Sequence, residues 1–323
     1  MWKYILKRVL WLIPSLLAVS LIICFLAVLT PGEPARIILG NEATDTDIAK
    51  FNHEMGLDKP FFEQYLDFIV GILHGDFGTS YVTGNSITEE IKIRFPYTLR
   101  LAFIGVALSV FIGIPLGVYA ATHQYTWKDN ASIFLSLFCV SMPGFWFALM
   151  LVQLFSRKLG WLPSMGVEHW YSYILPCITV AVAEAASLAR QSRSSMLEVI
   201  RQDYITTARA KGVNESRVIY KHALKNALMP VITLVATSLA ASMGGAIVAE
   251  TIFSIPGMGS YVVRAVNQRD YGVVKGTVVL LAFIFAVCML LIDLGYAFID
   301  PRIRSQYVRK KTSGKKTEKG TVQ

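Results

Sequence analysis

The sequence predicts an all-α membrane protein with six transmembrane helices. Of its 323 residues, 54% are hydrophobic and 16% are charged, and the mean hydropathy is +0.49. A globular surface with so large an apolar excess would be insoluble in water. Several apolar stretches are long enough to cross a hydrocarbon core of about 30 Å. In lipid such a stretch must be a helix, because a helix satisfies its own backbone hydrogen bonds.

The first apolar stretch, residues 9–29, follows Lys3, Lys7 and Arg8, as the core of a signal peptide would. It is longer than the usual core of a signal peptide, however, and no cleavage site with small residues follows before Pro31. We therefore interpret residues 1–30 as a cytoplasmic end followed by an uncleaved transmembrane helix.

Five further spans follow by hydropathy, at residues 98–121, 133–155, 173–189, 228–249 and 274–299. Pro115, Pro143 and Pro176 lie within or at the edge of three of these spans, where each should kink or start a helix. Residues 97–300 are thus expected to form a five-helix core.

The distribution of charge predicts the orientation in the membrane. If the N-terminus is cytoplasmic, the inner segments hold three bases before the first span, Lys128, eight bases from 190 to 225 and eight from 302 to 319. These are twenty of the 31 lysines and arginines. Residues 31–94, on the other side, hold eleven acids and five bases. The positive-inside rule therefore predicts a multi-pass cell-membrane protein with both termini cytoplasmic.

The extracytoplasmic segment, residues 31–96, is long enough to fold. Thr46 or Asp47 is expected to cap a short helix through Met55, and Pro60 to open a second helix over 61–73. Residues 75–81 read as a turn-rich loop.

The basic tail, residues 301–323, contains too little apolar surface to fold. We interpret it as a disordered cytoplasmic segment, and weak attraction to anionic lipid is the alternative.

The polar stretch 203–230 interrupts the apolar spans and carries many positive charges. It is expected to form two short helices joined at Gly212, a residue that readily adopts the positive φ that ends a helix. The first helix starts at the acidic Asp203 and ends at the basic Lys211, as the helix dipole favours. Asn214 is expected to cap the second helix, which runs through Val218, His222 and Asn226 until Pro230 re-enters an apolar run. We interpret this stretch, within the inner segment 190–227, as a cytoplasmic docking element through which another protein moves the membrane part.

Catalytic motifs are missing from the sequence. HExxH, GxSxG and the Walker A loop are absent, and residues 275–277 hold Lys-Gly-Thr in the wrong order for a phosphate loop. The five histidines are scattered, and the four cysteines lie in apolar runs without a CxxC pair. We therefore expect no enzyme activity, no metal site and no ATP site in this chain.

Two acids, Glu184 and Asp293, lie within the predicted spans. A charge at mid-membrane costs about 2.5–3.5 kcal/mol on insertion scales, so both acids would face the protein interior or a watery path. Alternatively, they lie near the inner interface and pair with nearby bases, such as Arg190 for Glu184.

The fifth span has one face of small, partly polar residues at three- to four-residue spacing: Thr233, Thr237, Ala240 or Ala241, and Gly244. Such a face suits close packing of helices. It also suits the wall of a path for a hydrated solute, and one face could serve both purposes.

The docking stretch resembles the coupling loop of ABC-transporter permeases, whose motif is roughly Glu-Ala-Ala, three residues and Gly. Here the positions read Thr206, Thr207, Ala208, Arg209, Ala210, Lys211 and Gly212. Thr-Thr replaces the leading Glu-Ala, so any role of that glutamate does not carry over. The longer form, residues 203–230, is similar to the B-type subunit of the dipeptide, oligopeptide and nickel branch. Residues 4–8, 56–60, 64–65, 75–80, 253–259 and 300–302 also match that subunit.

The resemblance implies a type I ABC importer permease fold and a set of partners. A homologous second permease would enclose the path with this chain, within the lipid bilayer. Two cytoplasmic ATPase subunits, which would bind ATP and Mg, would receive Asp203 and residues 206–212 in surface grooves. An extracytoplasmic solute-binding protein would deliver the solute. The lettering of 208–218 is also similar to a DNA-reading helix-turn-helix, but the flanking spans hold it too close to the membrane for nucleic acid.

Three alternatives to a peptide importer remain open. A nickel or metal-chelate importer could use His53, His74 or His169, but these lie singly on the outer side. An ion-driven secondary transporter would need inverted repeats and broken helices around an ion site, and would leave the docking stretch without a role. A regulatory subunit without a path would purify with an ATPase but give no stimulated uptake.

Overall fold

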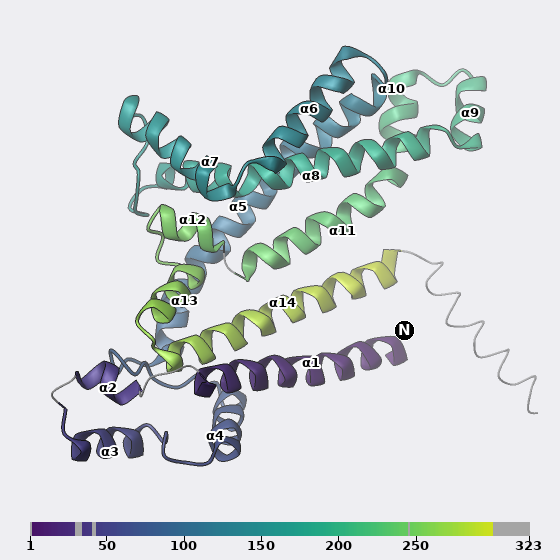
Figure 1. Cartoon of the computed structure of the whole chain (residues 1–323). Helices are drawn as coiled ribbons and strands as arrows, with labels where there is room; N and C mark the ends of the chain where they lie inside the picture. The colour runs from purple at the N-terminus through teal and green to yellow at the C-terminus, as the bar shows by residue number, and fades with distance from the viewer. Residues whose placement is uncertain (1, 30–33, 41–42, 245, 300–323) are drawn as a thin grey trace, which may run out of the picture.

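The computed structural model describes residues 2–29, 34–40, 43–244 and 246–299, which are almost entirely helical (Figure 1). The long helices are α1 Trp2–Leu29, α5 Ile87–Thr122, α6 Trp127–Ser141, α8 Ile174–Ile200, α11 Leu224–Met243 and α14 Tyr271–Ile299. The shorter elements are α2 Pro34–Leu39, α3 Asp45–Glu54, α4 Phe61–Leu73, α7 Gly144–Leu151, η1 Val152–Lys158, η2 Trp170–Tyr173, α9 Asp203–Ala210, α10 Glu215–Arg217, η3 Val218–Ala223, α12 Ile247–Ile252 and α13 Met258–Asn267.

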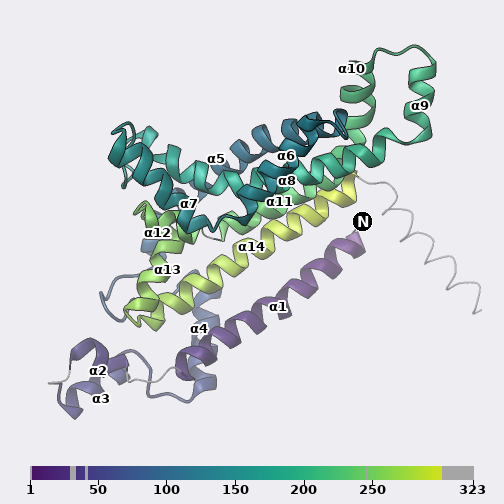
Figure 2. The same cartoon turned by 45° about the horizontal axis from the view of Figure 1, so that its top comes forward.

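The long helices lie side by side, and the shorter ones gather at the two ends of the bundle (Figures 1 and 2). One end holds the start of α1, the end of α14 and the hairpin of α9 and α10. The opposite end holds α2, α3, α4, α12 and α13. The predicted cytoplasmic segments that the structure describes thus share one end, as an even number of membrane crossings requires. The tail 301–323 and the motif residues 300–302 lie outside the described residues.

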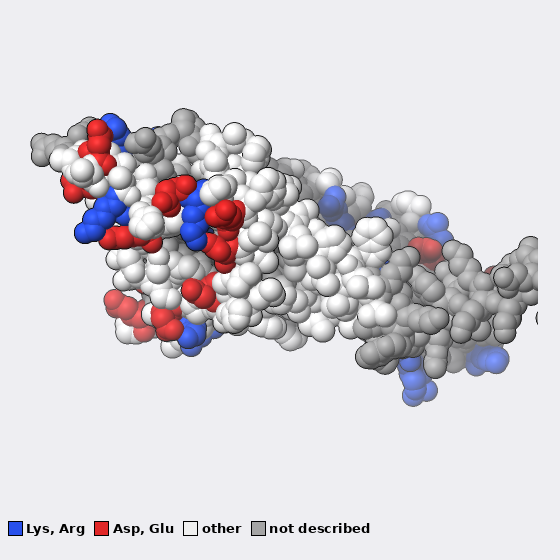
Figure 3. Space-filling view, turned by 90° about the horizontal axis from the view of Figure 1, so that it is seen from below, with Lys and Arg blue, Asp and Glu red and all other residues white. Residues whose placement is uncertain are grey.

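Charged side chains are concentrated at the two ends of the molecule (Figure 3). In this view, acidic and basic residues cluster over the end that carries α2, α3 and α4. A broad band without charged side chains separates them from a mainly basic group at the other end. An apolar belt between two charged ends is the surface that a lipid bilayer requires.

Five helical stretches are long and apolar enough to cross a membrane: Arg8–Leu29, Ile87–Thr122, Trp170–Ile200, Glu215–Met243 and Tyr271–Ile292. The remaining predicted span, 133–155, which is the third along the chain, is not one straight helix. Its two parts, Trp127–Ser141 and Gly144–Lys158, meet at an angle of 98°. The break falls at Pro143, because proline disfavours the helical conformation of the residue before it, and Met142 is extended with ψ 128°.

Several helices extend beyond the predicted spans. The fourth span was expected to end at 189, but α8 continues to Ile200, and α5 begins at Ile87 rather than near 98. Hydropathy detects only the apolar part of a helix, whereas charged residues such as Arg and Glu also favour helix. The fifth span, in contrast, ends early: α11 stops at Met243, and α12 is a separate short helix.

The closest packing in the core is between α5 and α8, and it depends on two glycines spaced four apart. A Cβ on Gly113 would lie 2.5 Å from the carbonyl oxygen of Ala185. A Cβ on Gly117 would overlap the carbonyl oxygen of Ala189 and lie 2.6 Å from the Cβ of Ser192. Small residues at this spacing let two membrane helices approach until their backbones touch.

Two of the helices within residues 31–96 were predicted and differ from the prediction at one cap, whereas α2 was not predicted. Helix α4 spans Phe61–Leu73 after Pro60, as expected. Helix α3 is capped by Thr44 rather than by Thr46 or Asp47. The Thr44 hydroxyl accepts a hydrogen bond from the Asp47 amide, and the Asp47 carboxylate accepts one from the Thr44 amide. Asp47 is therefore the third helical residue of a capping box, and the hydrogen bonds from Thr44 lower the pKa of its carboxyl.

Candidate coupling site and transport path

The polar stretch forms a helical hairpin at the end of the bundle. Helix α9 ends at Ala210, and Gly212 follows with φ +75°, a value that side chains disfavour. The Asn214 side chain then accepts a hydrogen bond of 2.9 Å from the Ser216 amide and caps the second helix. Arg209 and Glu215 join the two arms through hydrogen bonds of 3.1 and 2.7 Å. The predicted turn, cap and helices are all present.

A buried apolar cluster anchors the hairpin to the bundle. Ile205 of α9 and Val218 of η3 are fully buried in a cluster with residues of α5, α8, η3 and α11, namely Val118, Ala121, Met196, Ile219, Ala223 and Ala227. The Asn226 amide also donates a 2.7 Å hydrogen bond to the Tyr204 hydroxyl. The second arm continues without a break into the span Glu215–Met243. A force applied to the hairpin therefore acts on a transmembrane helix directly.

The predicted coupling residues lie together on this hairpin. Seven are exposed: Asp203, Thr206, Thr207, Arg209, Ala210, Lys211 and Gly212. The eighth, Ala208, is half-buried and packs against the apolar cluster beneath α9. The hairpin thus presents a polar, solvent-facing surface, and Ala208 belongs to its base rather than to that surface.

The four predicted path residues of α11 do not share one environment. Thr233 and Thr237 are half-buried, and each hydroxyl donates a hydrogen bond to a backbone carbonyl one turn earlier. Gly244 is the residue at which α11 ends. Ala241 is exposed and lines an open hollow of about 370 Å³ between α7, α8, α11 and α12, together with Thr179 and Ser242. Of the four, only Ala241 lines this hollow.

Of the two intramembrane acids, the structure describes the side chain of Glu184 but not that of Asp293. Glu184 on α8 accepts a 2.5 Å hydrogen bond from Ser238 on α11. Within the described residues, no ion pair joins Glu184 to Arg190. For Asp293 the structure describes the backbone, in α14, but not the side chain.

Glu250 is a further buried acid, which was not singled out from the sequence. Glu250 is fully buried where α5, α12 and α13 meet. One carboxylate oxygen accepts a 2.7 Å hydrogen bond from the Thr98 hydroxyl, and the other accepts a 2.9 Å hydrogen bond from the Ser260 amide. Thr98 in turn accepts a 2.8 Å hydrogen bond from the Met258 amide. Burial raises the pKa of the Glu250 carboxyl, although these hydrogen bonds oppose the shift.

Two glycines that follow α12 lie against the Glu250 carboxylate. A Cβ on Gly257 would lie 2.5 Å from Oε2 of Glu250, and one on Gly259 would lie 3.0 Å from the same oxygen. Glycine at these two positions lets the start of α13 close around the carboxylate, which also interacts favourably with the positive end of the helix dipole.

A second missed pair links α6 to α8. Asp129 is 1% exposed, and its two oxygens accept hydrogen bonds of 2.6 and 2.7 Å from the Arg193 guanidinium. The Tyr125 amide donates a third, of 3.1 Å. The sequence reasoning counted Arg193 only as one of the inner bases, since its partner is 64 residues away.

The loop predicted at 75–81 is fastened to the start of α14. The Ser80 hydroxyl and the Tyr81 amide donate hydrogen bonds of 2.5 and 3.1 Å to the buried carboxylate of Asp270. The segment between α1 and α5 is therefore joined to the core at the start of α14.

Comparison with known proteins identifies two matching families that together span most of the chain. Residues 113–305 match the binding-protein-dependent transport system inner membrane component. Residues 1–102 match the N-terminal part of such membrane components.

Individual relatives match along nearly their whole length. The glutathione transport system permease protein GsiC of Salmonella choleraesuis is 41% identical over 304 residues, which cover 94% of this chain and 99% of the relative. The GsiC proteins of Pectobacterium atrosepticum and Escherichia coli K12 are 41% and 39% identical over the same lengths.

Solved structures of the inward-facing MetNI methionine ABC transporter have a similar fold. Two of them align with TM-scores of 0.54 and 0.57 at 17% identity, covering 65% of this chain and 96% of the matched chain. At this identity the likeness concerns the fold alone. The family matches and the GsiC relatives show more: this chain belongs to the inner-membrane components of binding-protein-dependent transport systems, and is a permease of the type I ABC importer family whose ATPase lies in separate subunits.

Proposed function

We propose that this permease imports di- or oligopeptides and is driven through the α9–α10 hairpin by ATPase subunits on the cytoplasmic side. ABC importer permeases of this family work with other permease, ATPase and binding-protein components. In the proposed assembly, one homologous permease encloses the path with this chain, and two ATPases bind the coupling hairpins. An extracytoplasmic binding protein delivers the peptide to the end that carries α2, α3 and α4.

The hairpin carries this proposal. Its outer face is polar and exposed, while its base is packed into the bundle through Ile205 and Val218. Such an element transmits displacement, because packed helices move as rigid bodies rather than bending. ATP binding by the partner subunits would then shift the span Glu215–Met243 and change access to the path.

The relatives support a peptide as the transported solute. Three GsiC proteins at 39–41% identity are named for the transport of glutathione, which is a tripeptide. The hollow beside Ala241 is lined mainly by small and aliphatic residues, and the hydroxyls of Thr179 and Ser242 are the side-chain groups there that could hydrogen-bond to a peptide backbone.

The docking role is tested by enlarging an exposed residue of α9. Thr206→Trp changes the polar face without touching the apolar base, whereas Gly212→Pro would also break the turn and an enlarged Ala208 would disturb packing. We expect Thr206→Trp to lose most ATPase co-purification and ATP-dependent uptake in proteoliposomes. The matched control is Thr46→Trp, an exposed threonine at the opposite end, and only its ATPase co-purification is compared, because the binding protein is proposed to act at that end.

Two outcomes would contradict the docking role. One is normal uptake and normal ATPase binding by Thr206→Trp. The other is an equal loss in the Thr46→Trp control, which would indicate a general folding defect. The substrate is tested separately: uptake of labelled glutathione and dipeptides by the assembled importer should require ATP and survive collapse of ion gradients. Nickel uptake without peptide uptake would overturn the proposed substrate class.

A further inference from the structure

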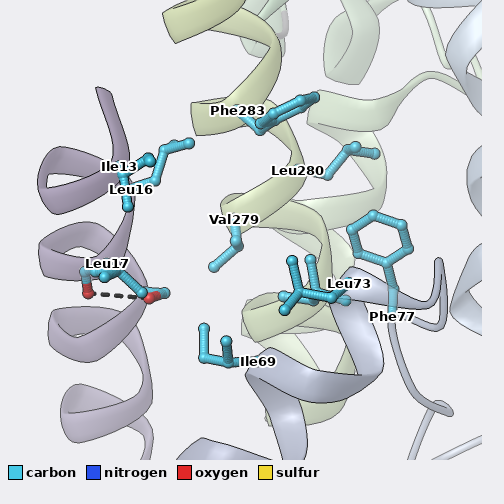
Figure 4. A pocket seen from close by; sticks show the side chains of 11 residues that line it. Ile13, Leu16, Leu17, Ile69, Leu73, Phe77, Val279, Leu280 and Phe283 are labelled. Atoms are coloured by element: carbon cyan, nitrogen blue, oxygen red, sulfur yellow. Dashed lines mark hydrogen bonds between the residues drawn. The ribbon is translucent and has the colours of Figure 1, made fainter. Parts of the chain in front are cut away.

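An apolar pocket of about 410 Å³ lies between α1, α4 and α14 (Figure 4). Its walls include Leu16 and Leu17 of α1, Ile69 and Leu73 of α4, and Val279 and Phe283 of α14. The volume is in the range of ligand-binding pockets, roughly 300–1,000 Å³. Nothing in the described chain fills this space.

The pocket offers almost no polar group to an occupant. Ser20 is the one polar side chain among its lining residues, and its hydroxyl donates a 2.9 Å hydrogen bond to the Leu17 carbonyl. The Ser20 hydroxyl also lies 3.0 Å from the Tyr65 hydroxyl of α4. Since these contacts already satisfy the serine, the occupant must be apolar where it meets the pocket.

The pocket lies at the level of the membrane spans and is open to the surroundings of the chain. Leu17 is near the middle of the span Arg8–Leu29, and Phe283 is near the middle of Tyr271–Ile292. Their exposed fractions are 43% and 48%, so both side chains contact the surroundings of the chain as well as the pocket. Hydrocarbon chains of the bilayer are the solvent at this depth.

The positively charged side chain of Lys275 lies at the end of the pocket nearest α2–α4. Lys275 precedes Val279 by four residues on α14, which places the two on the same face and about 6 Å apart along the helix axis. The Lys275 ammonium donates a 3.2 Å hydrogen bond to the Tyr81 hydroxyl and lies 5.9 Å from the Phe68 ring centre.

The ammonium of Lys275 is half-buried and lacks an acidic partner. No carboxylate of the described residues lies within ion-pair distance of it, whereas other lysines, such as Lys59 and Lys92, have one. An ammonium has three protons to donate, and one suffices for Tyr81. A partly buried charge without a counter-ion is costly, so this position favours an anionic group.

We propose that α1, α4 and α14 form a binding site for an anionic phospholipid, with its phosphate beside Lys275 and one acyl chain in the apolar pocket. The order of the two features matches the lipid: Lys275 lies four residues into the span, near the headgroup level, and the pocket continues toward mid-membrane.

The site is tested with the full chain purified in detergent. Phosphatidylglycerol and phosphatidylcholine with identical acyl chains are titrated, and bound lipid is counted by native mass spectrometry. Leu17→Trp fills the pocket and is expected to reduce binding of both lipids. Lys275→Gln is expected to reduce the preference for phosphatidylglycerol about fivefold, because one basic residue near anionic headgroups contributes about that factor.

Matched controls separate the site from general effects. Leu10→Trp places the same ring on α1 at an exposed position outside the pocket, and Lys92→Gln removes an exposed charge that is paired with Glu89. Both controls should bind lipid as the unmodified chain does, and thermal unfolding confirms that each variant folds. Unchanged lipid binding by Leu17→Trp and Lys275→Gln would overturn the proposal. So would a polypeptide, rather than lipid, that cross-links to a cysteine placed at Leu17.

Discussion

Glu250 lies where three helices meet, and its two carboxylate oxygens accept hydrogen bonds from α5 and from the start of α13. The Thr98 hydroxyl that it binds also accepts a hydrogen bond from Met258, so the three residues form one buried network. In such a network each group depends on the others, because a donor left without an acceptor in the interior is costly.

Replacement of Glu250 should therefore destabilise the outer end of the bundle. We expect Glu250→Ala to lower the free energy of unfolding by about 1–3 kcal/mol, since it leaves the Thr98 hydroxyl and the Ser260 amide without an acceptor. Glu250→Gln keeps the shape and one acceptor oxygen, so its loss should be smaller. Thermal unfolding in detergent measures both, with the exposed Glu54→Ala as control.

The prediction is tested by comparing the stabilities of the alanine variant, the glutamine variant and the unmodified chain. An alanine variant as stable as the unmodified chain, or less affected than the glutamine variant, would show that the network contributes little to stability.

The role of a residue could be predicted from the sequence when its partners lie close to it along the chain. Gly212 and Asn214 act on their immediate neighbours, and their predicted roles in the turn and cap are present. Glu250 and Thr98 are 152 residues apart, so no local pattern connects them. An acid directly after an apolar span, followed by closely spaced glycines, was the one available signal. A separation of 64 residues likewise hid the partner of Arg193.

At the scale of elements, composition predicted the helices better than their ends. Helix α4 and the two arms of the α9–α10 hairpin were predicted, because proline, glycine and capping residues mark their boundaries. The 98° bend at Pro143 was predicted only as a kink or a start. How far a chain turns at a proline depends on what packs against it, and the sequence does not contain that information locally.

The contact between α5 and α8 yields the second prediction. A methyl group on Gly117 would overlap the carbonyl of Ala189, so Gly117→Ala must push the two helices apart. Overpacking of this kind costs about 1–3 kcal/mol. Gly144→Ala is the matched control, since a Cβ there meets no atom within 4 Å.

Thermal unfolding of the two variants in the same detergent distinguishes the outcomes. We expect a lower unfolding temperature for Gly117→Ala and an unchanged one for Gly144→Ala. Equal unfolding temperatures would mean that α5 and α8 do not pack as closely as described.

At the scale of the whole molecule, function depends on which end faces the cytoplasm. The hairpin, the start of α1 and the end of α14 share one end of the bundle, and α2, α3 and α4 occupy the other (Figures 1 and 2). The distribution of basic residues favours the hairpin end as the cytoplasmic one. ATP is available only on that side, so an ATPase reaches the hairpin only in this orientation.

Cysteine labelling in intact cells tests the orientation. The four native cysteines are first replaced by serine or alanine, and then Thr46→Cys or Ser313→Cys is introduced. A membrane-impermeant maleimide should label position 46 in intact cells and position 313 only after the cells are opened. The reverse pattern would place the hairpin outside the cell, where no ATPase could act on it. Because Thr46 lies on α3 and the hairpin lies at the opposite end, one accessible label fixes the direction of the whole bundle and thereby the direction in which the proposed import must proceed.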